Sequence, residues 1–141
     1  MKKTINTSFI YAVVAMVAGV FYREFTKLQG FEEKTTLSVL HTHLFLLGMV
    51  MFLLVTVFIR LFELNKAKKY KFFFVIYNVG VCLTTVMLAV RGIFQVLGTE
   101  LNNAQNGMLS GFAGIGHIFL GVGIILLFLS LKESVSTLQK S

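Results

Sequence analysis

The sequence predicts an all-α integral membrane protein, folded as an up-down four-helix bundle. Of its 141 residues, 56% are hydrophobic, and the mean hydropathy is +0.81. A soluble domain of this size cannot bury so much apolar surface, whereas lipid can solvate it. Four apolar stretches, separated by short polar connections, follow one another along the chain. Short connections favour antiparallel neighbours, so residues 1–141 are interpreted as one four-span domain.

The four predicted spans cover residues of about 6–26, 36–62, 70–98 and 107–132. The first has the shortest apolar run, and it reaches membrane length if its polar ends lie among the lipid headgroups. Lys2 and Lys3, placed before that run, are also typical of a signal peptide. No small-x-small cleavage site follows them, which favours a retained membrane anchor. The other three stretches are long enough to cross the hydrocarbon core.

Basic residues predict the orientation of the chain. One side of the predicted topology carries nine of them: Lys2, Lys3, Arg60, Lys66, Lys68, Lys69, Lys71, Lys132 and Lys140. The first-to-second connection has three, diluted by glutamates, and the third-to-fourth connection has none. The positive-inside rule therefore places both termini in the cytoplasm, and we expect the chain to lie in the plasma membrane.

The net charge of +7 invites comparison with nucleic-acid-binding proteins. The basic residues lie at membrane ends, however, where anionic lipid explains them, so no nucleic-acid partner is expected. The single cysteine, Cys82, lies within a span, where it is interpreted as a small, buried apolar residue. No nucleophile with a paired base and no phosphate-binding loop is evident, so the sequence leaves enzyme status open and leans against it.

All three histidines of the chain fall in one layer of the predicted bundle. Counted from the outer ends of their spans, His41 and His43 lie roughly 6 and 9 Å deep, and His117 about 14 Å deep. Arg91, the only arginine well inside a span, lies about 10 Å deep on the third span. Ionisable groups inside a membrane are costly, and they usually face the bundle interior and pair with each other or with a ligand. The cluster therefore predicts a cofactor site between the second and fourth spans, which are diagonal partners.

Helical geometry separates the two histidines of the second span. Residues two apart point about 200° away from each other, so His41 and His43 cannot both face the core. Gly48 on the same face favours His41 as the ligand, with His43 as the alternative. On the fourth span, Ser110, Gly114, His117 and Gly121 share one face, and the two glycines would leave room for the edge of a porphyrin. Close helix packing explains such small-residue faces equally well.

Arg91 has Gln95 one turn away, and Arg23 with Glu24 ends the first span at a similar height. In one interpretation, Arg91 forms an ion pair with Glu24 and extends toward the membrane surface. In the other, Arg91 binds a haem propionate or another anion through two hydrogen bonds. Both interpretations can hold in turn.

The stretches "GVFYREFTK", "LSVLHTHLFLLG", "AVRGIFQVLG" and "GIGHIFLG" resemble an uncharacterised family (DUF type) of small four-span membrane proteins from Gram-positive bacteria. In addition, "HTHLFLLG" is similar to the second-span motif of haem-copper oxidase and nitric oxide reductase catalytic subunits. That resemblance implies that His41 binds a low-spin haem, with His117 as its partner. It does not extend to the histidine cluster that those subunits use for their second metal.

Three functions follow as hypotheses. The first is a haem b protein ligated by His41 (or His43) and His117, with Arg91 on a propionate, active in electron transfer or haem/gas sensing. Two imidazoles fill both axial positions of the iron, which favours electron transfer, with quinol or a redox protein as partner. The second is a zinc or copper site, since imidazole suits both metals, within one chain or across a homo-oligomer. The third is a structural or accessory membrane subunit without a cofactor.

Overall fold

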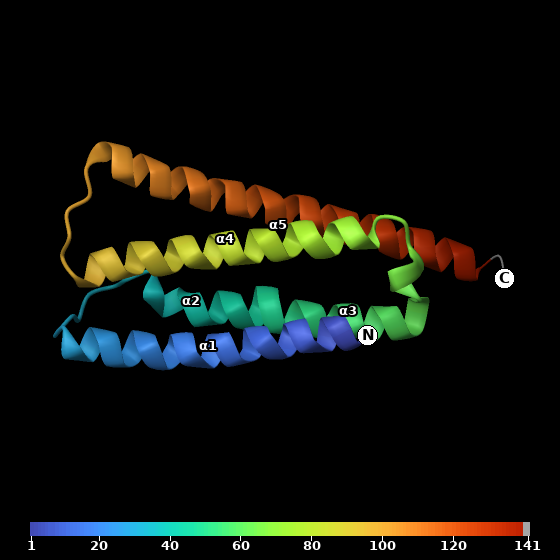
Figure 1. Cartoon of the computed structure of the whole chain (residues 1–141), viewed down its shortest axis with the longest axis horizontal. Helices are drawn as coiled ribbons and strands as arrows, with labels where there is room; N and C mark the ends of the chain where they lie inside the picture. Colours follow the sequence, from blue (N-terminus) through green and yellow to red (C-terminus); the bar gives the residue numbers. More distant parts are fainter. Residues whose placement is uncertain (140–141) are drawn as a thin grey trace.

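The computed structural model describes residues 1–139, and it confirms the all-α fold with four helices long and apolar enough to cross a membrane (Figure 1). The first span is α1 (Lys2–Leu28), and the third is α4 (Tyr70–Val96). The second span consists of α2 (Leu37–His43), a π-helical segment η1 (Leu44–Val50) and α3 (Met51–Phe62). A short 3₁₀ turn, η2 (Leu64–Lys66), leads to α4, and α5 (Asn103–Leu138) forms the fourth span.

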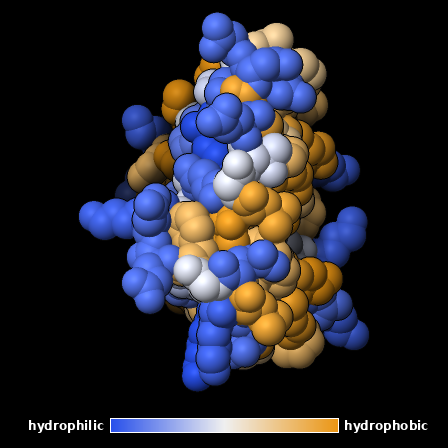
Figure 2. Space-filling view, turned by 90° about the vertical axis from the view of Figure 1, so that its left-hand side faces the viewer, coloured by the Kyte–Doolittle hydropathy of each residue, from blue (hydrophilic) through white to orange (hydrophobic). Residues whose placement is uncertain are grey.

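The helices run up and down, so both ends of the chain lie at the same end of the bundle (Figure 1). We call this end, which also holds the 63–69 connection, the terminal end. The opposite end, which holds connections 29–36 and 97–102, is the loop end. Figure 2 looks onto the loop end, where hydrophilic side chains cover much of the surface and hydrophobic ones show along one side. This distribution fits helices that run through lipid and turn in water.

Helix boundaries follow local capping chemistry. The fourth helix begins at Asn103, earlier than the predicted 107, because Asn102 and Gln105 form a reciprocal capping box. At the other end it continues beyond the predicted 132 to Leu138. The third helix ends at Val96, and the chain turns through Gly98, whose φ of +63° favours a residue without a side chain.

Helix packing leaves one side of the bundle open. The most extensive interface joins α4 to α5, and α1 packs along the whole second span. The second span also packs on α4, whereas it meets α5 only through α3, toward the terminal end. No substantial contact joins α1 to α5 within the described residues. The sequence predicted a compact bundle, and the structure differs in having α1 and α5 as outer helices that do not close the ring.

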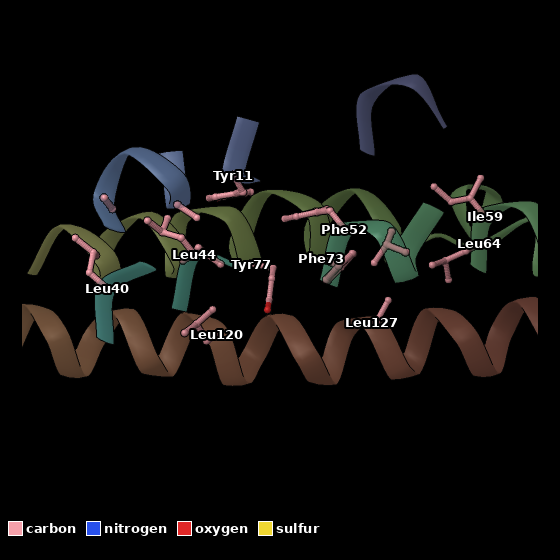
Figure 3. Packing of buried hydrophobic residues seen from close by; sticks show 14 of the residues in the cluster. Tyr11, Leu40, Leu44, Phe52, Ile59, Leu64, Phe73, Tyr77, Leu120 and Leu127 are labelled. Atoms are coloured by element: carbon pink, nitrogen blue, oxygen red, sulfur yellow. The ribbon is translucent and has the colours of Figure 1, made fainter. Parts of the chain in front are cut away.

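Aromatic rings fill the core at the level of Phe52 (Figure 3). The Phe52 ring stacks on Tyr11 at 5.9 Å and meets Tyr77 edge-on at 5.8 Å, measured between ring centroids. Phe73 and Tyr77 are fully buried beside it. Leu120 and Leu127 reach the same core from α5. This cluster joins all four spans, and it lies nearer the terminal end than the histidines do.

Glycines allow the closest helix contacts. A Cβ atom at Gly48 would overlap the Tyr11 ring, and one at Gly116 would lie 2.6 Å from Thr84 Oγ1. At Gly123, a Cβ would lie 2.8 Å from Cβ of Tyr77. Close backbone approach through small residues is the usual mode of helix association in membranes. The face of α5 that packs on α4 is therefore the Gly116–Gly123 face.

Candidate functional site

The second span changes its hydrogen-bonding pattern immediately after its two histidines. From Leu44 to Val50 the backbone is π-helical, whereas α-helix surrounds this segment on both sides. Such segments are rare, and they occur often at functional sites. Gly48 lies within η1, and the Tyr11 ring occupies the space that a side chain there would need. Nothing in the amino-acid pattern predicted this irregularity.

His41 packs against the first helix. A Cβ atom at Gly19 of α1 would lie 3.7 Å from His41 Cγ. The His41 Nδ1 atom is buried and has no hydrogen-bond partner among the described residues. An unpaired nitrogen in an apolar setting is costly, and in membranes such groups commonly mark a ligand or a proton route.

His43 occupies the opposite side of the second span, as the 200° separation predicts. Its ring is partly exposed, and Nδ1 lies 2.8 Å from the carbonyl oxygen of Val39, one turn back. Because that carbonyl can only accept, Nδ1 carries the proton. Nε2 is therefore the ring nitrogen that points away from the backbone of its own helix.

His117 has the same arrangement on the fourth span. Its Nδ1 lies 2.8 Å from the carbonyl oxygen of Ala113. The ring is exposed, because His117 is about 100° around the helix from Gly116, which faces α4. The expectation that His117 points into the bundle interior is therefore wrong for the isolated chain.

Gly114 and Gly121, the two glycines predicted to leave room beside His117, also lie on the exposed side of α5. No atom outside the local helix lies within 4 Å of a Cβ built at either position. The face of α5 with Gly116 and Gly123 thus packs on α4, whereas the face with Gly114, His117 and Gly121 is exposed. The sequence predicted space beside the imidazole, and the structure places that space at the bundle surface.

His43 and His117 lie at the same depth. On α5, Gly116 contacts Thr84 of α4, which places its neighbour His117 at that level. The second span is placed by two bonds to α4: Thr36 Oγ1 donates to the Leu88 carbonyl, and Tyr77 Oη donates to the Leu47 carbonyl. His43 lies between those two contacts, and therefore beside the turn of α4 that contains Thr84. At this depth the second span and α5 flank α4 without substantial contact with each other.

Arg91 extends from α4 toward α5 at the loop end. Its Nη2 atom donates to Ser110 Oγ at 2.8 Å, and no acidic side chain lies within ion-pair distance among the described residues. The guanidinium lines an open cavity of about 440 Å³ between the two helices, which Gln95 and Ser110 also line. Gln95 Oε1 accepts a hydrogen bond from the backbone N–H of Thr36. Ser110 lies two turns before His117 on the same face of α5, so Arg91 and His117 lie on one face of the α4–α5 pair.

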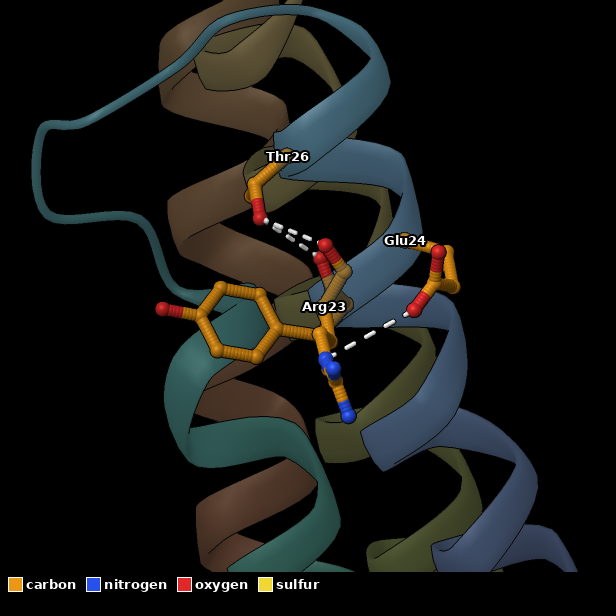
Figure 4. A network of polar contacts seen from close by, with 4 residues as sticks. Arg23, Glu24 and Thr26 are labelled. Carbon is orange, nitrogen blue, oxygen red and sulfur yellow. Dashed lines mark hydrogen bonds and ion pairs between the residues drawn. The ribbon is translucent and has the colours of Figure 1, made fainter.

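The predicted ion pair between Arg91 and Glu24 is wrong. Glu24 lies 3.6 Å from Arg23, its neighbour on α1, and both side chains are largely exposed (Figure 4). Thr26 nearby bonds only to the carbonyls of Tyr22 and Arg23. Because α1 and α5 lie on opposite sides of the open bundle, Arg23 and Glu24 stay away from the Arg91 cavity.

Metal-ligating side chains do not gather in large groups. Within residues 1–139, no set of three or more His, Cys, Asp or Glu side chains is placed to hold a metal ion. His41 and His43 point to different sides of one helix, as described above.

Comparison with known proteins gives one match. A family model described as "Protein of unknown function (DUF2871)" matches residues 1–134. No curated protein and no solved structure matches the chain. Nearly the whole described chain, including all three histidines and Arg91, falls within the matched region. This small four-span membrane protein therefore belongs to the DUF2871 family.

Proposed function

We propose that this chain is a membrane haem protein in which His43 and His117 hold haem b between the second span and α5. The observation that carries the proposal is that both imidazole rings form the same hydrogen bond. Each donates Nδ1–H to the carbonyl one turn back, at 2.8 Å, and each leaves Nε2 for a ligand. Histidines that bind metals usually hold their second nitrogen in this way, which fixes the tautomer and the ring direction.

The surroundings fit a flat apolar cofactor. The second span and α5 make no substantial contact with each other at this depth, among the described residues. Gly114 and Gly121 leave open space on either side of His117 along α5. Arg91 has no acidic partner among the described residues, so its guanidinium is available for a carboxylate such as a propionate.

Bound haem would supply one-electron redox chemistry, and the imidazoles of His43 and His117 would hold it. The residues of this chain would fix the ring directions through the Val39 and Ala113 carbonyls. They would also exclude water by apolar packing and place positive charge near the carboxylates through Arg91. Electron transfer is the activity that this donor set favours, with quinol or a redox protein as partner.

His41 is the competing ligand on the second span. Its buried Nδ1 has no hydrogen-bond partner among the described residues, and a bound group could supply one. Its ring, however, packs toward α1 and away from α5. Spectra of the separate variants distinguish the two histidines.

Visible absorption spectra of the purified protein, oxidised and dithionite-reduced, test the proposal. We expect a Soret band with sharp α and β bands that disappear in His43→Ala and in His117→Ala, but persist in His41→Ala. Gly121→Leu should lower the haem content without lowering the melting temperature of the haem-free protein, because its side chain enters space that no other helix fills. A colourless protein with stoichiometric zinc or copper would indicate the metal site, and a colourless metal-free protein would indicate a structural subunit; both overturn the proposal.

A further inference from the structure

A second cavity lies on the other side of the bundle, between α1 and α4. Its volume is about 440 Å³, and Leu44 of the second span forms part of its lining. The walls are mostly apolar, including Ile10 and Val86. The cavity is open toward the surface that the fold presents to lipid, so a ligand can reach it from within the bilayer. Pockets of this size, largely apolar with a few polar groups, are typical of small-molecule sites.

The polar atoms of this cavity gather around Tyr11. Its hydroxyl donates to Asn78 Oδ1 at 2.9 Å, and it lies 3.6 Å from Cys82 Sγ. Asn78 Nδ2 donates to the Phe74 carbonyl and keeps a second N–H. Thr85 Oγ1 donates to backbone carbonyls of its own helix and keeps its lone pairs. Tyr11, Asn78, Cys82 and Thr85 therefore offer both donors and acceptors to a further group.

This tyrosine cluster is separate from the histidine site. Asn78, Cys82 and Thr85 lie on the side of α4 that faces α1, whereas Gly80 and Thr84 lie on the side that faces α5. The two sites therefore use opposite sides of one helix. An inference about the cavity does not depend on whether the histidines bind haem.

The lining restricts the chemistry of a ligand. Among residues 1–139, no charged side chain lines the cavity, so a charged ligand would find no counter-charge there. The ligand must be neutral and soluble in lipid. The N–H of Asn78 and the thiol of Cys82 can donate to a carbonyl, and the oxygens of Tyr11 and Thr85 can accept from a hydroxyl. A ring whose oxygens are carbonyls when oxidised and hydroxyls when reduced can bond to these donors in one form and to these acceptors in the other.

We infer that the cavity between α1 and α4 binds the ring of a lipid-soluble quinone, in its quinone or quinol form, against Tyr11, Asn78 and Cys82. The apolar tail leaves the cavity into the surrounding lipid. The inference concerns binding alone, and no reaction at Cys82 is required.

Photo-crosslinking of the full chain in lipid nanodiscs with a short-tailed azidoquinone tests this inference. We expect adducts on α1 and α4 at the cavity, located by mass spectrometry. Decylubiquinone at about ten times its Kd should lower them about tenfold, because it occupies about nine-tenths of the sites. Adducts at Phe128, which is exposed on α5, report non-specific labelling from lipid and should not be lowered.

Variants decide whether the polar atoms bind the ring. Asn78→Leu keeps the side-chain size and removes the amide, so the competed adduct should be lost. Tyr11→Phe removes one oxygen and keeps the ring stacking, which makes it the second test if Asn78→Leu does not fold. The control Val79→Leu, at an exposed position outside the cavity lining, should retain the adduct. Uniform adducts without competition, or competed adducts unchanged in both test variants, would overturn the inference, whatever the haem spectra show.

Discussion

Many polar side chains of the described residues form hydrogen bonds to the backbone of their own helix. His43, His117, Thr85 and Ser130 each bond to a carbonyl one turn back. Polar groups in hydrocarbon need a partner, and the nearest carbonyl is the one that is always available. His41 Nδ1 and Thr84 Oγ1 depart from this pattern, since both are buried without a partner among residues 1–139.

Glycine substitutions on α5 should separate the packing face from the open face. Gly116→Ala places a methyl group 2.6 Å from Thr84 Oγ1, so we expect a loss of about 1–3 kcal/mol in stability, as in other overpacked cores. Gly114→Ala meets no atom within 4 Å and should cost nothing. Thermal denaturation in detergent measures both. Equal melting temperatures for the two variants would show that the α4–α5 contact is looser than described.

Arg91 should tune a bound haem without holding its iron. Arg91→Ala removes the positive charge beside Ser110, so the reduction midpoint should shift to lower potential while most haem is retained, because a nearby cation favours the reduced state. Potentiometric titration followed by visible spectra measures both quantities. Arg91→Lys keeps the charge and should keep the midpoint close to that of the unsubstituted protein. Complete loss of haem in Arg91→Ala would contradict a tuning role.

At the scale of helices, hydropathy predicted the four spans within a few residues, because apolar length is what the bilayer selects. The first turn of α5 was not predicted, since Asn102 and Gln105 cap the helix within a polar connection. The direction of His117 was not predictable in the same way. Small residues occur on two sides of α5, and the helix is apolar all round, so neither face stands out as the packing face.

The π-helical segment should tolerate the loss of one residue. Bonds from i to i+5 take up one residue more than α-helix would, so deletion of exposed Leu46 should restore α-helix and keep both flanking faces in place. Deletion of Leu53, also exposed but in regular α3, turns everything after it by about 100° and should prevent folding. Detergent-stable yield and melting temperature provide the comparison. Folding of both deletions, or of neither, would contradict this interpretation of η1.

For the whole molecule, four spans and the distribution of lysines predict where the ends lie. Reporter fusions at the N-terminus and at the C-terminus should both report the cytoplasm, because the positively charged 63–69 connection lies at the same end of the bundle. Green fluorescent protein and alkaline phosphatase, fused in turn to each end, measure this. A fusion within the 97–102 connection is the control and should report the opposite side. Opposite results at the two termini would contradict the four-span topology itself.

An even number of crossings has a practical consequence for covalent dimers. Since each copy finishes on the side where it started, two copies can be joined in tandem by a water-soluble linker, with no additional helix and with neither copy inverted. His43 and His117 could then both be substituted in one half alone. If a single chain supplies both axial ligands, such a hybrid keeps half of its haem; if ligands are shared between copies, the loss is larger.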